Sequence, residues 1–101
     1  MHYQIDPGTK NNVILIHVDE FLPAVKFSGV TLSYRKGCEP SESIRPVVIA
    51  LGNVKGVQSY HMDGYSVRFL KGKLFDRQQV IKDIVECLGQ CEALQPLERV
   101  L

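Results

Sequence analysis

The stretch GNVKGVQSYHMDGYSVRFL, residues 52–70, decides the fold. It reads as the end of a helix, a strand, a two-residue turn and a second strand. Asp63-Gly64 supplies the turn, because a tight hairpin of this kind needs positive φ at both central residues and Asp-Gly adopts such angles at low cost. The sequence therefore predicts an antiparallel pair of strands at 57–62 and 65–70.

The register of this hairpin separates an apolar face from a polar face. If Met62 lies opposite Tyr65 across the turn, large apolar side chains share one face, because side chains alternate along a strand. That face carries Tyr60, Met62, Tyr65, Val67 and Phe69, and the other carries Ser59, His61, Ser66 and Arg68. Such a half-buried pair needs helices to cover its apolar side.

The composition is typical of one small domain. The chain has 101 residues, 45% of them hydrophobic, and 12 Lys and Arg against 11 Asp and Glu. This near balance of charge argues against nucleic acid and against an anionic membrane surface as partners. The longest apolar run, residues 13–16, is too short to span a bilayer, and the first residues lack the features of a signal peptide. We therefore expect a soluble, cytoplasmic protein whose three cysteines are free thiols.

Two further strands are expected before the hairpin. The β-branched run at 13–18 indicates a strand with two apolar faces, and residues 30–35 alternate apolar and polar side chains. Between them, residues 19–29 are interpreted as a connecting segment, because Pro23 interrupts both helical and strand patterns.

Two helices are expected, one on each side of the hairpin. Ser43 is the expected N-cap of the first helix, with Pro46 in its first turn and Gly52 at its end. The second helix is expected to begin at Asp76 and to end at Gly89. Asp76 and Gln79 have the spacing of a capping box, and Phe75 and Val80 that of a hydrophobic staple.

These elements predict an α+β two-layer sandwich in the order ββαββα. Its four-stranded sheet would be antiparallel or mixed, with both helices on one face. Residues 1–90 are expected to form the single domain. Residues 91–101 would be a C-terminal tail in which the last five residues are either a short extra strand or a loose end. An exposed edge of the sheet would allow pairing with a second copy of the chain.

The order of elements, the entry GNVKGVQSY and the acidic turn before YSVRFL resemble the N-terminal domain of the Nfu/NifU iron–sulfur cluster scaffold proteins. The resemblance covers residues 2–90. It includes the early turn DPGTKNNVILI and the Gly56-Val57 pair, although Asp6-Pro7-Gly8-Thr9 replaces the Pro-Asn-Pro core of the family. The cluster-binding Cys-x-x-Cys of that family belongs to another domain and is absent here. The resemblance therefore implies a protein-binding, non-enzymatic accessory role in iron–sulfur cluster assembly, with no cofactor held by this chain.

Residues 30–88 also resemble the heavy-metal-associated domains of copper chaperones, although less closely. Those domains bind soft metals through a Cys-x-x-Cys before the first helix, where this chain has only Cys38. The alternative function is thus a soft-metal carrier that uses Cys38 with Cys87 or Cys91. Cys87 and Cys91 are four residues apart and would share a face of a continued helix, but cysteine is also one of the most commonly buried residues.

The polar face of the hairpin is the expected protein-binding surface, formed by Ser59, His61, Ser66 and Arg68. The predicted register places His61 opposite Ser66, but nucleophilic catalysis also needs an orienting group and an oxyanion site, and the sequence shows neither. The partner protein is not identified by any motif.

Basic residues at one end of the hairpin form a second candidate surface. Four of them would form a rim able to contact a phosphate backbone: Arg68, Lys71, Lys73 and Arg77. Nucleic-acid binding ranks behind protein and metal binding, because no nucleic-acid motif accompanies these charges.

Overall fold

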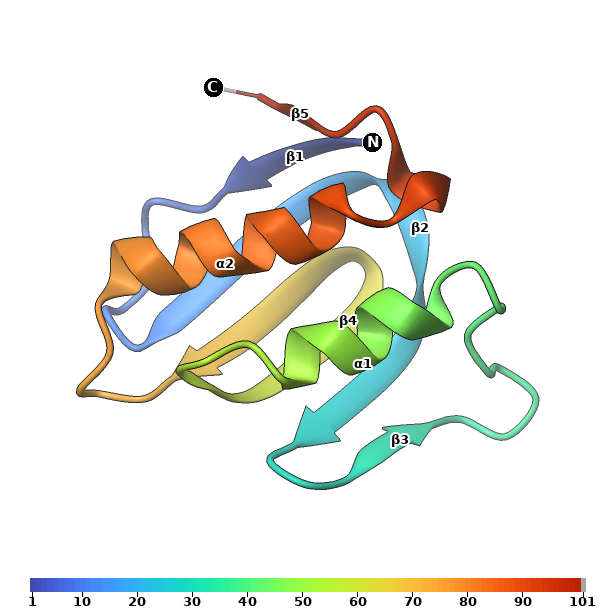
Figure 1. Ribbon diagram of the computed structural model, residues 1–101, viewed down its shortest axis with the longest axis horizontal. Helices are drawn as coiled ribbons and strands as arrows, with labels where there is room; N and C mark the ends of the chain where they lie inside the picture. The colour runs from blue at the N-terminus through green and yellow to red at the C-terminus, as the bar shows by residue number, and fades with distance from the viewer. Residues whose placement is uncertain (101) are drawn as a thin grey trace.

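Five strands form one mixed sheet, and two helices lie over one of its faces (Figure 1). The structure is a computed structural model that describes residues 1–100. The elements in chain order are β1 His2–Ile5, β2 Val13–Ser28, β3 Leu32–Tyr34, α1 Arg45–Gly52, β4 Val57–Lys71, α2 Arg77–Gly89, the 3-10 turn η1 Glu92–Leu94 and β5 Glu98–Arg99. The α+β class and the two helices are therefore confirmed. The predicted four-stranded sheet and the order ββαββα are only roughly consistent with this sheet of five strands. β1 was not expected, the two strands of the predicted hairpin are one bent strand, β4, and β5 lies where a short extra strand was one of the two alternatives.

Two long strands, one nested inside the other, make up the centre of the sheet. The β4 ribbon turns back on itself (Figure 1), and its ends meet where the Gly72 amide donates to the Gly56 carbonyl at 2.8 Å. β2 wraps around this hairpin: residues 13–17 pair with 66–70, and residues 25–28 pair with 59–62. The two halves of β2 thus flank the two limbs of β4.

The turn of β4 lies at the predicted place but has different geometry. Gly64 has a φ of 64° and is paired with Leu22, whereas no residue other than glycine has a positive φ in residues 1–100. The predicted turn with positive φ at both Asp63 and Gly64 is therefore wrong. Tyr65 was expected in the core but is 59% exposed, and its ring contacts Phe21 edge to face, with 5.6 Å between centroids.

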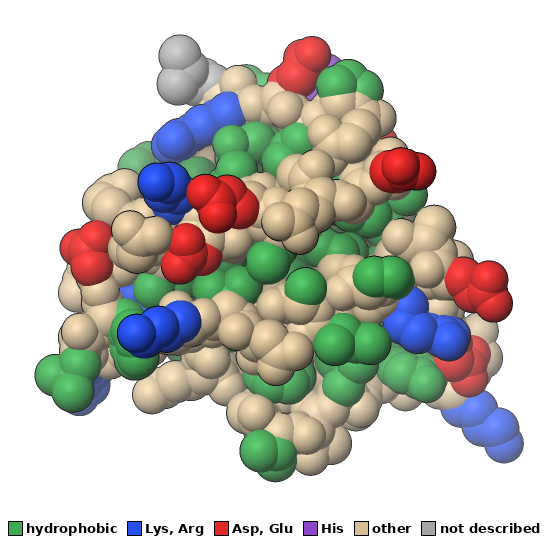
Figure 2. Space-filling model, in the orientation of Figure 1, with side chains coloured by type: hydrophobic (Ala, Val, Ile, Leu, Met, Phe, Trp, Pro, Cys, Tyr) green, Lys and Arg blue, Asp and Glu red, His purple; other side chains and the backbone are tan. Residues whose placement is uncertain are grey.

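The remaining apolar side chains of the hairpin lie beneath the helices as predicted. Tyr60, Met62, Val67 and Phe69 are all buried, and the Tyr60 hydroxyl donates to the Val48 carbonyl of α1. They pack with a core whose other fully buried members include Ile14, Ile16, Leu51 and Ile84. Figure 2 shows the outer side of the two helices, where apolar, acidic and basic side chains are interspersed.

The interpretation of residues 19–29 as a connecting segment is wrong, because most of them belong to β2. Pro23 lies where the register between β2 and β4 shifts, between Leu22 and Val25. A proline is tolerated in a strand at such an irregularity, since the ladder hydrogen bond that it cannot donate is already missing. The strand expected at 30–35 is shortened to β3, which pairs with residues 25–27 of β2.

The helices begin close to the predicted positions. The Asp76 carboxylate accepts a hydrogen bond from the Gln79 amide at 3.0 Å, as a helix N-cap does. The Gln79 side chain donates to Asp83 at 2.9 Å, so the capping box is only half formed. The Ser43 cap is wrong: α1 begins after Ile44, and no side chain caps it.

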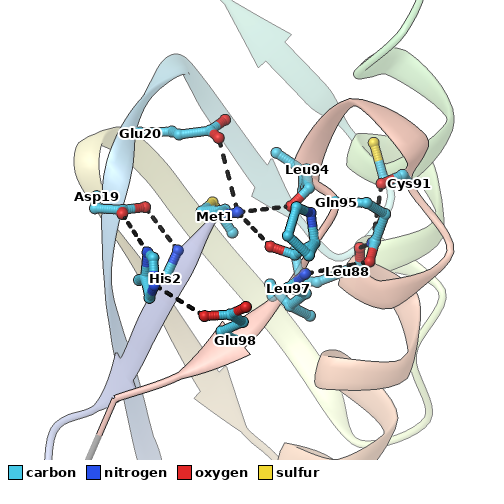
Figure 3. Close-up of polar contacts among 11 residues, drawn as sticks. Met1, His2, Asp19, Glu20, Leu88, Cys91, Leu94, Gln95, Leu97 and Glu98 are labelled. Carbon is cyan, nitrogen blue, oxygen red and sulfur yellow. Dashed lines mark hydrogen bonds and ion pairs between the residues drawn. The ribbon is translucent and has the colours of Figure 1, made fainter.

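The C-terminal segment packs against the domain. Leu94 is 2% exposed, and β5 pairs in parallel with β1. The amino group of Met1 donates to the carbonyl oxygens of Leu94 at 2.9 Å and Pro96 at 2.6 Å (Figure 3). The segment expected as a tail therefore contains a short strand at 98–99 and contributes to the core. None of the helices within residues 1–100 has the length and apolarity that crossing a membrane would require.

Candidate functional site

The face of the sheet opposite the helices carries a broad depression of about 800 Å³. We call it the sheet-face depression. Three of the four residues predicted for a binding surface, His61, Ser66 and Arg68, line it together. Ser59 does not line it, and is paired with Ser28 further along the sheet. The other residues that line it are Gly8, Thr9, Lys10, Asn12, Val13, Leu15, Asp63 and Leu70.

Cross-strand pairing places the polar side chains of this depression. Arg68 lies opposite Leu15, and Lys26 lies opposite His61. Because paired residues point to the same side of a sheet, these side chains share the face that no helix covers. Leu15 is half-buried and Leu70 is 39% exposed, so aliphatic carbon lies between the charged groups.

Arg77 holds the loop that forms one wall of the depression. Its guanidinium donates to the carbonyl oxygens of Lys10 at 3.3 Å, Asn11 at 3.2 Å and Val13 at 2.5 Å, and to the Thr9 hydroxyl at 3.1 Å. These are charge-assisted hydrogen bonds, which are stronger than bonds between neutral groups. Sequence reasoning missed this role, because the partners of Arg77 are more than sixty residues away and three of the four are backbone carbonyl oxygens.

The basic rim expected at the end of the hairpin is not formed as predicted. Lys71 is 2% exposed, and its ammonium donates to the carbonyl oxygens of Gly72 at 2.9 Å and Phe75 at 2.7 Å. Arg77 is engaged with the loop described above. Two of the four cations in that rim therefore serve the fold.

A smaller depression of about 320 Å³ continues from the first across the sheet. The two share His61 and Asp63, and the second is also lined by Lys26, Tyr34 and Arg35. Within residues 1–100, the four ion pairs involve the Met1 amino group, His2 and His17 as the cationic partners.

The cationic groups of the two depressions thus form no ion pair with a carboxylate of the described chain. Nearby, His17 contacts Asp6 at 3.0 Å, and this hydrogen bond, with that from the Gly8 amide, lowers the pKa of the Asp6 carboxyl.

The three cysteines lie in two different places. Cys38 is exposed and lines a hollow beside Phe21 and Pro23. Cys87 and Cys91 line another hollow, of about 380 Å³, between the start of α1, the end of α2 and η1. The structure therefore brings Cys87 and Cys91 to one hollow and leaves Cys38 outside it.

The two thiols in that hollow point to different backbone groups. The Cys91 thiol donates to the Ser43 carbonyl at 3.4 Å, and the Cys87 thiol lies 4.0 Å from the Ala50 carbonyl oxygen. Burial raises the pKa of the Cys87 thiol, with smaller contributions from the charges of Asp83 and Glu86. In the part of the chain that the structure describes, no three His, Cys, Asp or Glu side chains are grouped so that they could hold a metal ion.

A polar cluster joins the two ends of the chain (Figure 3). The His2 ring contacts Asp19 of β2 at 2.8 Å and Glu98 of β5 at 3.0 Å. These interactions, chiefly the hydrogen bond to Asp19, raise the pKa of His2 above its usual value of 6.5. The sequence signal for β1 was only the alternation of His2, Tyr3, Gln4 and Ile5, which is too short to distinguish a strand from a polar start.

Comparison of the chain with protein-family models, with curated proteins and with solved structures found no match.

Proposed function

We propose that this chain is a small non-catalytic protein-binding module that works through the helix-free face of its sheet. The sheet-face depression is the observation that carries the proposal. It combines the aliphatic side chains of Val13, Leu15 and Leu70 with a rim that includes Lys10 and Arg68. An apolar centre with a polar rim is the usual anatomy of a protein–protein interface.

The scaffold around this depression is suited to recognition. Its side chains stand on paired strands, and the Arg77 guanidinium ties its loop wall to α2 through four hydrogen bonds. A surface that is already ordered before binding loses less conformational entropy when a partner docks. The edge strands β3 and β5 have three and two residues, so they offer few free backbone groups for pairing with a second copy.

Photo-crosslinking in the native cell tests this proposal. A photoreactive phenylalanine analogue replaces Ser66 in the depression, or Ile49 on the exposed side of α1 as the matched control. We expect a discrete protein adduct from position 66 that is absent from position 49 and is weakened by Arg68→Ala. Adducts from position 49 alone, or none from position 66, would contradict the proposal.

The resemblance to the Nfu N-terminal domain extends the proposal to the class of partner. On this basis we propose that the module is an accessory to iron–sulfur cluster assembly. Mass spectrometry of the position 66 adduct checks this directly. A partner with no connection to cluster assembly would leave protein binding in place and remove the accessory role.

A soft-metal carrier is the second candidate, and the shared hollow of Cys87 and Cys91 is the observation that favours it. Two thiolates can hold Cu(I), which prefers soft ligands. Titration of the reduced protein with Cu(I), followed by thiolate absorbance, separates the candidates. Stoichiometric binding that is lost in Cys91→Ser and kept in Cys38→Ser supports a carrier that uses this hollow. Loss in both variants supports the pairing of Cys38 with Cys91, loss in Cys38→Ser alone supports the pairing of Cys38 with Cys87, and absence of binding rejects every carrier alternative.

A further inference from the structure

The two depressions on the helix-free face adjoin each other, and we consider them together as one groove. They meet at His61 and Asp63, which line both. From this junction the groove runs in one direction to the loop at 8–12 and in the other to β3. We call it the sheet-face groove. It crosses several paired strands, so its length exceeds that of either depression alone.

The charge along the groove is strongly one-sided. Four cationic side chains line it, and Asp63 is the one carboxylate among its described lining residues. The cations are Lys10, Lys26, Arg35 and Arg68, all exposed. The whole chain has a formal net charge of only +1, so positive charge is in excess among these lining residues, although the Asp6 carboxylate borders them through its hydrogen bond with the Gly8 amide. None of the four ion pairs described above includes these cations.

Apolar groups alternate with these cations. Leu15 lies beside Arg68 in the pairing of β2 with β4, and Leu70 is 39% exposed. A ligand that fits this arrangement carries anionic groups for the rim and aliphatic groups for the spaces between them. Electrostatic complementarity of this kind chiefly determines which partner binds and how fast.

We infer that the sheet-face groove binds an acidic polypeptide segment in which aliphatic residues are interspersed among Asp and Glu. This inference rests on the proposed protein-binding function and specifies the chemistry of the partner. In an extended segment, every second side chain points to the same side. Acidic and aliphatic residues that take turns at these positions then place carboxylates on the cations of the rim and aliphatic side chains on Leu15 and Leu70.

The groove fits such a segment better than a single-stranded nucleic acid. Proteins that bind single strands stack successive bases on several aromatic side chains, whereas Tyr34 is the one aromatic residue among the described lining. Asp63 also interrupts the row of cations at the centre of the groove. Discrete carboxylates, which a peptide can space to avoid Asp63, suit this interruption better than a continuous phosphate backbone.

Fluorescence anisotropy with defined probes tests the inference. The probe is a short fluorescein-labelled peptide in which every second residue is by turns acidic, Asp or Glu, and aliphatic, Leu or Val, with Ser at the positions between them. The comparison probes are a peptide with Lys in place of the acidic residues, an acidic peptide with Ser in place of the aliphatic residues, and an oligothymidylate. We expect saturable binding of the first probe, weaker binding of the Ser peptide, no binding of the Lys peptide, and affinity for the first probe that falls as salt is raised.

Charge reversals locate the binding. Arg68→Glu is expected to lower the affinity for the first probe about tenfold, because one lost or reversed rim contact is worth roughly 1.4 kcal/mol of binding free energy. Lys82→Glu on α2 makes the same change of charge at an exposed position outside the groove, and affinity should stay within about twofold. Circular dichroism of both variants confirms that they are folded.

Several outcomes would overturn the inference. It fails if the acidic aliphatic peptide is not bound at all, if Arg68→Glu and Lys82→Glu lower its affinity equally, or if the oligothymidylate binds more tightly than the peptide does. If the peptide fails while position 66 still gives a protein adduct in the native cell, protein binding stands and the acidic segment is rejected. If neither experiment succeeds, both the function and its specification are rejected.

Discussion

A series of glycine substitutions tests the turn of β4, around which β2 wraps. Gly64 has a φ of 64°, and a Cβ built there would meet only a ring carbon of Phe21, at an ordinary 3.8 Å. Gly64→Ala therefore adds backbone strain without a clash, and we expect it to cost about 1 to 2 kcal/mol of unfolding free energy. Gly64→Asn should cost less, because Asn tolerates the left-handed region better than Ala.

Gly56→Ala should cause the largest loss of unfolding free energy in the series. The φ of Gly56 is 97°, and an added Cβ would lie 2.8 Å from a methyl carbon of Val80 and 2.9 Å from the Phe75 ring. Overpacking adds about 1 to 3 kcal/mol to the strain, so Gly56→Ala should cost about 2 to 5 kcal/mol.

Gly89→Ala should cause the smallest loss of unfolding free energy in the series. Gly89 lies at the end of α2 with nothing within 4 Å of an added Cβ, so Gly89→Ala should be neutral or slightly stabilising.

Urea denaturation measures all four substitutions against the wild-type chain. For a domain of this size, each 1 kcal/mol corresponds to a shift in melting temperature of about 4 °C. The m-value should stay constant, because the surface exposed on unfolding does not change. Wild-type stability of Gly64→Ala, or a larger loss at Gly64 than at Gly56, would refute the placement of the turn.

Three further predictions concern the helix cap, the ends of the chain and the thiols. Asp76→Ala should lower the unfolding free energy by about 1 kcal/mol, since it removes the cap of α2, and Asp76→Asn should recover most of the loss. Because the pKa of His2 is raised in the folded state, its contribution to stability is present below pH 6.5 and is lost as pH rises through the folded pKa. Urea titrations across this range should show that loss in the wild type and not in His2→Gln. Ellman's reagent should modify Cys38 quickly and Cys91 only on unfolding, because Cys38 is exposed and Cys91 is 7% exposed; equal rates would contradict the packing of η1.

The parts of the fold that follow from local chemistry were predictable from the sequence. Asp63-Gly64 marks a reversal of the chain whatever its detailed turn type, and the alternation from Tyr60 to Phe69 separates the core face from the outer face. The cap at Asp76 is equally local, since the two groups that form it are three residues apart.

The nesting of β2 around β4 was not predictable in the same way. It depends on pairing between residues about thirty to sixty positions apart, and Pro23 obscures the strand pattern at the point where β2 bends. Residues 19–21 are also all exposed, which breaks the alternation typical of a half-buried strand. Local propensity carries no information about such a long-range partner.

The candidate site shows the same division. His61, Ser66 and Arg68 were predicted together because they belong to one hairpin. Lys10 and Lys26 join them in space from a loop and from the second half of β2, so only the observed pairing reveals the concentration of positive charge.

Chemical-shift mapping of the ¹⁵N-labelled protein with the acidic aliphatic peptide tests the central claim most directly. Binding through the helix-free face predicts that the largest amide shifts occur at Leu15, His61, Ser66 and Arg68, with little change in α1 and α2. Shifts concentrated at Ala50, Cys87 and Cys91, in the hollow between the helices, would contradict the account.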